Sequence, residues 1–275
     1  MFDLKGSTVL VTGAGMGMGR LFALQAAHEG AGHVVLWDID GTTLERVADE
    51  IRALGATPHP SVIDVADAAA IDQAANALLT TLGPPDLIVN NAGVVRGNAW
   101  FWETDPRRDI DPVIRINTLA PMHVVRALLP AMVADASRER RILNISSAAA
   151  TVSNPRMSVY AASKWAMLGW SDSLRLELKQ SGHRHLRVTT FCPSYITTGM
   201  FEGARGPLLT PLMSPETAVA AAWIGMRRGT PIVMKPWTTQ LAKVLKGILP
   251  LPIWDFVAGR IFHVYNSMDH FRGRH

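Results

Sequence analysis

Residues 8–20, TVLVTGAGMGMGR, join a short apolar run to four closely spaced glycines and then to a helix-forming segment. The apolar and β-branched run predicts a buried strand over 8–12, and the segment 17–30 predicts a helix. Glycines at such a junction let the backbone turn sharply and approach a ligand, and the helix that follows offers free N–H groups to an anion. The glycines of this turn are Gly13, Gly15, Gly17 and Gly19. The first unit expected of the fold is therefore a strand, an anion-binding turn and a helix.

Short apolar runs continue to alternate with helical segments to about residue 235. Further strands are predicted at 33–37, near Asp64 and Val65, and in the segments PDLIVNNAG, RRILNISS, LRVTTFCP and PIVMK. Further helices are predicted over 41–54, 67–82, 108–135 and 158–181, and from Pro215. This alternation is typical of βαβ units in a parallel sheet that is covered on both faces. We therefore predict an α/β fold with a doubly wound, Rossmann-type parallel sheet of about seven strands. It forms one domain over 1–236, followed by a C-terminal extension over 237–275.

Composition limits the classes of protein to which the chain can belong. Of 275 residues, 48% are hydrophobic and 18% are charged, which indicates a globular protein with an ample core. The single cysteine, Cys192, excludes an internal disulfide framework and a multi-cysteine zinc site, and fits a reducing compartment. The first apolar run is short and is preceded by Asp3 and Lys5, so it predicts a strand and no signal peptide. We expect a cytoplasmic protein without a metal site or a membrane-spanning helix.

Asp38 ends the predicted second strand, 19 residues beyond Gly19. A carboxylate at this place after a glycine turn can accept hydrogen bonds from the ribose of an adenosine, so the turn and Asp38 together predict a dinucleotide site. A solvated turn capped by Asp38 is the plainer alternative. Because a carboxylate repels a 2′-phosphate, and because Met16 and Ile39 supply no cation, NAD(H) is favoured over NADP(H). An arginine from elsewhere in the fold would reverse that preference.

Tyr160 and Lys164 lie four residues apart in the segment SVYAASKWAM, which falls in a predicted helix. Residues at this spacing share one helical face. An ammonium beside a phenol favours the phenolate, and so would the positive nicotinamide ring of an oxidised cofactor, so we expect the pKa of Tyr160 to be lowered. The alternative is a packed aromatic residue beside a solvated lysine.

Taken in order, these motifs resemble those of the short-chain dehydrogenase/reductase family in its single-domain form. The spacing of 13 residues between serine and tyrosine selects Ser147 over Ser146. The matching motifs are Thr12-Gly13-x-x-x-Gly17-x-Gly19, Asp64, Asn90-Asn91-Ala92-Gly93, Asn117, Ser147, Tyr160-x-x-x-Lys164 and the turn Pro193 to Thr198.

The resemblance implies an enzyme that interconverts a secondary alcohol and a ketone with NAD(H). Tyr160 would be the general acid/base, and Ser147 would orient the substrate oxygen. Lys164 would hold the nicotinamide ribose, and Asn117 would bind a water that relays protons. The residues that the resemblance places around the cofactor are Gly13, Met16, Gly17, Met18, Asp38, Asp64, Val65, Asn91, Ala92, Gly93, Tyr160, Lys164, Pro193, Ile196 and Thr198. Homodimers or homotetramers are expected from the same resemblance.

Three other functions fit the sequence less well than this one. A sensor or scaffold that binds NAD(H) without turnover would have no need of intact Ser147, Tyr160 and Lys164. A sugar-nucleotide epimerase shares the Tyr-x-x-x-Lys motif, but the chain is short for its larger substrate domain. A role in nucleic-acid binding is not expected, because the basic residues are interleaved with large apolar ones.

The sequence departs from the family pattern at two turns. Ser194 stands where the family usually has glycine, so we expect an ordinary rather than a positive φ there. Met16 and Met18 stand where smaller or branched residues are common, and both can pack along a cofactor.

Two apolar segments, 94–105 and 199–214, would flank the substrate in this fold, and the second is a plausible lid. They form either an apolar substrate cleft or a subunit interface. The last 55 residues carry eight basic and two acidic residues, whereas the first 220 have a net charge of −2. The extension over 237–275 resembles those of family members that act on retinoid or steroid alcohols, which suggests a bulky hydrophobic substrate. It is expected to contact a membrane surface, to pack on a second subunit or to cover the substrate site.

Overall fold

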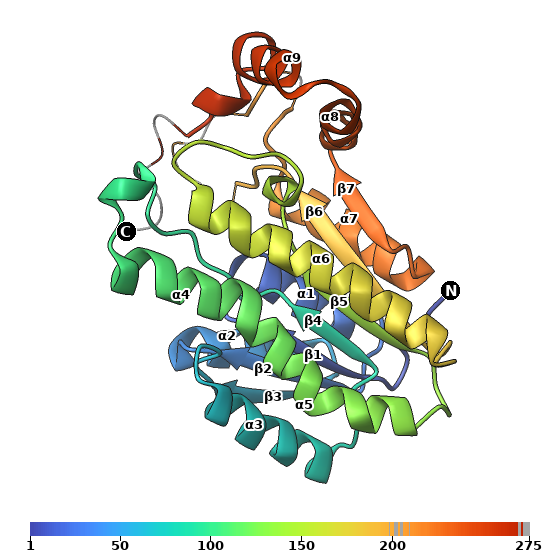
Figure 1. The fold of residues 1–275 in the computed structure, drawn as a ribbon. Helices are drawn as coiled ribbons and strands as arrows, with labels where there is room; N and C mark the ends of the chain where they lie inside the picture. The colour runs from blue at the N-terminus through green and yellow to red at the C-terminus, as the bar shows by residue number, and fades with distance from the viewer. Residues whose placement is uncertain (198, 201–202, 204–205, 209, 269–270, 272–275) are drawn as a thin grey trace.

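The computed structural model describes all residues except 198, 201–202, 204–205, 209, 269–270 and 272–275. Within the described part of the chain, seven strands form one parallel sheet in the order β3-β2-β1-β4-β5-β6-β7 (Figure 1). The strands are β1 (Thr8–Thr12), β2 (His33–Asp38), β3 (Thr57–Val62), β4 (Leu87–Asn90), β5 (Arg140–Ile145), β6 (Leu186–Pro193) and β7 (Ile232–Lys235).

Helices cover both faces of this sheet. Phe22, Leu44 and Trp223 bring α1, α2 and α7 into the core on one face. Ile71, Leu128 and Leu174 bring α3, α5 and α6 into the core on the other face. The α-helices are α1 (Gly17–His28), α2 (Gly41–Ala53), α3 (Ala68–Thr81), α4 (Asp111–Ile114), α5 (Ala120–Ala134), α6 (Ser158–Gln180), α7 (Pro215–Arg228), α8 (Trp237–Ile248) and α9 (Leu251–Phe256).

The central strands β1 and β4 are mostly apolar, and both of their faces are buried. In β1, Val9 and Val11 belong to one core cluster and Leu10 to the other, as the alternation of side chains along a strand requires. The predicted doubly wound α/β fold is therefore confirmed. The third strand ends earlier than predicted, at Val62, because Asp64 begins a turn in which its carboxylate accepts the N–H of Ala66 at 2.9 Å.

The long helical stretch begins at residue 106, close to the predicted 108, and is interrupted twice. Two π-helical turns, η2 (Pro106–Ile110) and η3 (Arg115–Leu119), flank α4 before α5 begins. The whole stretch to Ala134 is long and apolar enough to cross a membrane by length and composition alone. It packs on the sheet, with Val124, Leu128 and Met132 buried in the core.

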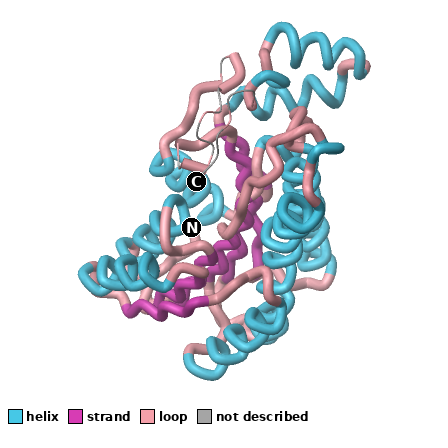
Figure 2. The backbone as a smooth tube through the Cα atoms, turned by 90° about the vertical axis from the view of Figure 1, so that its left-hand side faces the viewer, coloured by secondary structure: helices cyan, strands magenta, loops and turns pink. Residues whose placement is uncertain are grey.

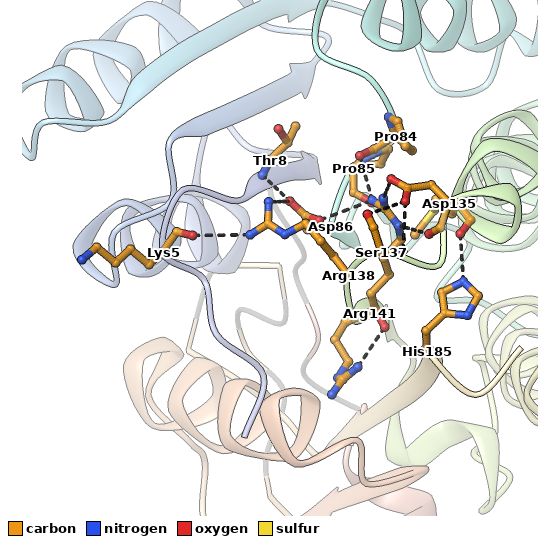
Figure 3. Close-up of polar contacts among 12 residues, drawn as sticks. Lys5, Thr8, Pro84, Pro85, Asp86, Asp135, Ser137, Arg138, Arg141 and His185 are labelled. Carbon is orange, nitrogen blue, oxygen red and sulfur yellow. Dashed lines mark hydrogen bonds and ion pairs between the residues drawn. The ribbon is translucent and has the colours of Figure 1, made fainter.

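The amino ends of β1 and β5 are closed by a buried charge network (Figure 3). The guanidinium of Arg140 is almost fully buried, pairs with Asp86 and Asp135, and donates to the carbonyls of Pro84 and Pro85 at 2.9 and 3.0 Å. Asp86 also accepts the N–H of Thr8 at 2.9 Å. The buried charge of Arg140 is thus paired at this end of the sheet.

The carboxyl ends of the strands are the open end. The order of the strands reverses between β1 and β4, so the connections that follow these two strands leave the sheet in opposite directions. Such a switch point creates a crevice at the carboxyl ends of the strands, which is where α/β sheets bind ligands. The glycine turn after β1 and the segment after β4 both border this crevice.

The segment after β7 forms a separate layer above the carboxyl ends of the strands. Figures 1 and 2 show α8 and α9 projecting together from the body at one extreme of the molecule. The buried side chains of Trp254 and Ala258 pack against Val152, which lies between β5 and α6. Met268 packs against Tyr160. The extension therefore lies over the residues that the sequence marks as the site.

Candidate active site

The turn after β1 can be made only by glycine at two of its positions. Gly13 has a φ of +65°, and a Cβ there would lie 2.9 Å from the Cα of Ala92. A Cβ on Gly19 would collide with the carbonyl oxygen of Gly13. Among the described residues, no side chain caps the first turn of α1. The N–H groups of that turn are thus available to an anion, as a dinucleotide phosphate requires.

Asn91 fastens the turn after β4 to the turn after β1. Its side-chain amide donates to the carbonyls of Thr12 and Gly13 at 3.0 and 3.1 Å. In return, the hydroxyl of Thr12 accepts the backbone N–H groups of Asn91 and Ala92, both at 3.1 Å. Asn90 lies in the sheet and donates to the amide oxygen of Asn144 at 2.8 Å. Both asparagines thus tie together strands and turns on the two sides of the switch point.

Asp38 is held at the end of β2 by two backbone groups. Its carboxylate accepts the N–H of Gly15 at 2.8 Å and the N–H of Asp40 at 3.1 Å. Asp38, Asp40 and Asp64 all face the crevice. Arg20, one helical turn into α1, is paired with Glu50. This end of the crevice is therefore acidic.

A pocket of about 350 Å³ fills the crevice and extends from Asp38 to Lys164. The predicted cofactor residues that line it are Gly13, Met16, Gly17, Met18, Asp38, Asp64, Val65, Asn91, Ala92, Gly93, Tyr160, Lys164, Pro193 and Ile196. Thr198 lies outside the described residues. The glycines and acids that line this pocket, together with the N-terminus of α1, fit a dinucleotide.

Tyr160 and Ser147 meet at the inner end of this pocket. Tyr160 is buried on the first turn of α6, and its hydroxyl is hydrogen-bonded to the side chain of Ser147. Burial raises the pKa of Tyr160 well above its usual value, and the bond to Ser147 offsets only part of that rise.

Lys164 lies one turn further along the same face of α6. Its ammonium donates to the carbonyl of Ile145 at 3.0 Å and lies 5.7 Å from the ring centroid of Tyr160. Burial lowers the pKa of Lys164 to about 8.

The pKa of Tyr160 is raised, whereas the sequence predicted that it would be lowered. Among the protein's own groups, desolvation of the phenol is the largest influence, and the charge of Lys164 is not among the causes of the shift. The ammonium is instead directed to a backbone carbonyl at the end of β5. The protein alone thus favours the protonated phenol, and a lowering by the positive nicotinamide ring stays a prediction.

Asn117 lies in the π turn η3, behind the pocket. Its amide oxygen accepts the N–H of Val94 at 2.8 Å, and its amide nitrogen donates to the carbonyl of Val94 at 2.9 Å and the hydroxyl of Ser163 at 3.2 Å. Its side chain thus ties the segment after β4 to α6. The predicted role of Asn117 in a proton relay stays a prediction.

A second, strongly apolar pocket of about 160 Å³ begins where the first one ends. Ser147, Tyr160 and Ser194 line both pockets. The walls of the second pocket come from η4 (Ala148–Ala150) and the residues after it, from Pro207, Leu208 and Thr210, and from the extension. The residues of the extension are Trp237, Thr238, Thr239, Leu241, Ala242, Leu245, Trp254, Phe262 and Val264.

Only one of the two predicted flanking segments lines this pocket. Pro207, Leu208 and Thr210 contribute from the segment 199–214. In the segment 94–105, Trp100 and Trp102 stack on each other, and both are exposed. The first segment therefore does not form the apolar cleft, within the described residues.

A polar cluster in the second pocket was not predicted from the sequence. Tyr195 and Ser267 are joined by their hydroxyls at 2.8 Å, and the amide nitrogen of Asn154 donates to them at 3.0 and 2.8 Å. Asn154 and Ser267 are 113 positions apart, and no motif links them. Ser194, the neighbour of Tyr195, does not have a positive φ, as its Cβ suggested.

Comparisons with known proteins agree with this geometry. The family model described as short chain dehydrogenase matches residues 7–207. Estradiol 17-beta-dehydrogenase 11 of Rattus norvegicus is 32% identical over 259 residues, which are 94% of this chain and 85% of the relative. Epidermal retinol dehydrogenase 2 of Mus musculus is 30% identical over 275 residues, 99% of this chain and 87% of the relative.

Two solved structures share the fold. A short-chain dehydrogenase/reductase from Burkholderia phymatum in complex with NAD superposes with a TM-score of 0.81 at 26% identity, covering 90% of this chain and 95% of that one. A metagenomic short-chain oxidoreductase in complex with NADP has a TM-score of 0.70 at 29% identity, covering 84% and 96%. The chain therefore belongs to the short-chain dehydrogenase family, as a nicotinamide-dependent oxidoreductase.

Proposed function

We propose that the protein interconverts a bulky, hydrophobic secondary alcohol and the corresponding ketone, with NAD(H) as cofactor. One observation carries this proposal: the pocket that fits a dinucleotide and the apolar pocket meet at Ser147 and Tyr160. A dinucleotide in the first and a substrate in the second would have their reacting atoms at the junction. The buried hydroxyls there are the groups that an alcohol or ketone oxygen needs.

The acids at the far end of the dinucleotide pocket support NAD(H) over NADP(H). A 2′-phosphate would face Asp38, and Asp40 and Asp64 add to the negative potential. The nearby Arg20 is already paired with Glu50. Of the described residues that line this pocket, Lys164 is the one cation, and it lies at the opposite end.

The residues at the junction would handle the proton. Bound NAD(H) supplies or accepts the hydride. Ser147 donates a hydrogen bond to the substrate oxygen and orients it, while Tyr160 delivers a proton to that oxygen during reduction. Because its pKa is raised by burial, the phenol is protonated at neutral pH and carries the proton that ketone reduction needs. Lys164, with a pKa of about 8, can return a proton to Tyr160.

The apolar walls of the second pocket support a hydrophobic substrate. Its polar groups are confined to the junction, to the cluster around Tyr195 and to three threonines. The names of two relatives refer to estradiol and to retinol, and both are bulky, largely apolar alcohols.

A panel of bulky ketones and alcohols, steroid, retinoid and aryl, tests the proposal by the change in NADH absorbance. We expect turnover with NADH and at least roughly tenfold less with NADPH. Equal or better activity with NADPH would contradict the cofactor assignment. NADH binding without turnover of any compound would instead favour a non-catalytic sensor or scaffold.

A further inference from the structure

Helix α8 presents two adjoining sides, one to the apolar pocket and one to the exterior. Its inner side, with Thr238, Ala242 and Leu245, lines the apolar pocket. Its outer side carries a stripe at helical spacing whose members are 39–73% exposed: Trp237, Leu241, Val244 and Ile248. A helix of a soluble domain ordinarily turns such a stripe to the core and polar residues to water. Within the described part of the chain, nothing covers this outer stripe.

The exposed apolar surface continues past the end of α8. Leu251, Ile253 and Phe256 are each more than half exposed, whereas Trp254 between them is buried and anchors α9 to the body. Both helices project from the molecule at the same extreme (Figures 1 and 2). We call the outer stripe of α8 together with these three residues of α9 the outer apolar face.

The segment that carries the outer apolar face has a positive net charge. Lys235, Lys243 and Arg260 are exposed, and Asp255 is the one acid between residues 235 and 261. A surface that combines large apolar side chains with cations is complementary to anionic lipid headgroups above acyl chains. A second copy of the chain would bring like charges together across a two-fold contact, which disfavours that occupant.

The mouth of the apolar pocket lies on the same face. Trp237, Leu241 and Leu208 are exposed and also line the pocket, so they connect its interior to the surface. Leu208 is joined to the extension by the bond from its N–H to the carbonyl of Phe262 at 2.9 Å. A lipid-dissolved molecule at the outer apolar face would therefore reach the pocket without crossing water.

We propose that α8 and α9 dock on an anionic lipid surface and that apolar substrate enters the pocket from that lipid. The docking stands on the outer apolar face and its cations alone. The entry of substrate rests also on the function proposed above. Docking and turnover are measured separately below, so the failure of one is distinguishable from the failure of the other.

Docking is tested by co-sedimentation of the full chain with phosphatidylcholine vesicles, with and without phosphatidylserine. We expect the wild type to sediment with the anionic vesicles and to be released as salt is raised, because salt screens exposed charges. The double variant Val244→Asp/Ile248→Asp should bind at least about a hundredfold more weakly, since two charges replace the apolar anchors. Neither residue lines a pocket.

The matched control is Ile224→Asp on α7. Ile224 is 50% exposed and Val244 is 49% exposed, but Ile224 lies outside the extension. This control should sediment like the wild type. The double variant Lys243→Glu/Arg260→Glu should bind anionic vesicles at least about tenfold more weakly. Its binding to neutral vesicles, which is weaker, should not change.

Each remaining outcome decides between the two parts. Turnover of an apolar alcohol without sedimentation on any vesicle would overturn docking and leave the proposed function standing. Sedimentation without any turnover would leave docking standing and contradict the proposed function, and the entry of substrate would fall with that function. If the wild type ignores vesicles but Val244→Asp/Ile248→Asp turns an oligomer into monomers on size exclusion, the outer apolar face is an interface between copies.

Discussion

The dinucleotide pocket and the apolar pocket share a border but are built in different ways. The first consists of turns at the carboxyl ends of β1, β2 and β4. These turns are fixed by hydrogen bonds between backbone groups and the side chains of Asp38 and Asn117, which accept, and of Asn91, which donates. The second is closed by helices that follow the last strand and pack through apolar contacts around Trp254. The catalytic residues are therefore positioned by the sheet and the segments that follow its strands, whereas we expect the C-terminal extension to select the substrate. Changes in one pocket should leave the function of the other intact.

The largest loss of turnover is expected from a change at the junction of the two pockets. Tyr160→Phe removes the proton that we assign to the substrate oxygen during reduction, so turnover should fall about a thousandfold or more. NADH affinity, measured by fluorescence titration, should stay within about twofold.

The matched control for this change is Tyr265→Phe. Its hydroxyl donates to Asp255 at 2.6 Å in the extension, away from the junction. Turnover of this variant should match that of the wild type. Wild-type-like turnover by Tyr160→Phe would remove the general acid/base from the proposed function.

Trp254→Ala tests whether the apolar pocket is independent of its neighbour. Trp254 is 2% exposed and packs on Val152 and Ala258. Removing such a side chain costs about 3 kcal/mol of local packing, so kcat/KM for a bulky substrate should fall roughly a hundredfold. NADH affinity should not change, because none of the described residues of the extension lines the dinucleotide pocket.

Trp102→Ala is the control for loss of a tryptophan, because Trp102 is 78% exposed and lines neither pocket. A fall in NADH affinity in Trp254→Ala would show that the two pockets are coupled after all.

Asp38→Ser tests the acidic end of the dinucleotide pocket. Removing the carboxylate lifts the repulsion of a 2′-phosphate, while serine still offers an oxygen to the N–H of Gly15. The ratio of kcat/KM for NADPH to that for NADH should rise roughly tenfold to a hundredfold. Asp49→Ser removes an equal charge from the exposed side of α2 and should leave the ratio unchanged. An unchanged ratio in Asp38→Ser would place the cofactor choice elsewhere.

The two pockets also differ in how far the sequence predicted them. The dinucleotide pocket follows from local signals: glycines that no other residue can replace, and an acid at a strand end. Its predicted residues therefore line one pocket, apart from Thr198, which lies outside the described residues. The sheet was predictable for a similar reason, since strands that are buried on both faces are apolar throughout.

The apolar pocket depends on contacts between segments that are distant in sequence, and no local signal encodes them. Asn154 meets Ser267 only because the extension folds back over α6. The tryptophans at 100 and 102 have the composition of a cleft wall but lie exposed. The pKa of Tyr160 was misjudged because burial of the phenol and the direction of the Lys164 ammonium depend on the tertiary structure.

The pH dependence of turnover should report on Lys164. Its pKa of about 8 means that the ammonium loses its charge as the pH rises through that value, whereas Tyr160 keeps its proton because its pKa is raised. The kcat/KM for ketone reduction should be flat below about pH 8 and should fall up to about tenfold per pH unit above it. Alcohol oxidation should rise over the same range.

Lys164→Arg should move this fall to higher pH, because a guanidinium stays protonated. A fall at the same pH in Lys164→Arg would assign the titration to another group.

The smallest effect is expected from Ser267→Ala, which loosens the polar cluster of the apolar pocket without touching the junction. Ser267 donates to the carbonyl of Val264 at 2.7 Å, so the hydroxyl of Tyr195 must be the donor in the bond between the two. The variant leaves the proton of Tyr195 and the amide of Asn154 each short of one partner. The loss of one such bond costs about 1 kcal/mol, which corresponds to about a fivefold rise in KM for a bulky ketone. The kcat and the NADH affinity should not change, whereas Ser181→Ala at the exposed end of α6 should change nothing. A fall in kcat would mean that Tyr195 positions the reacting oxygen, and that the apolar pocket takes part in the chemistry that we assign to the sheet.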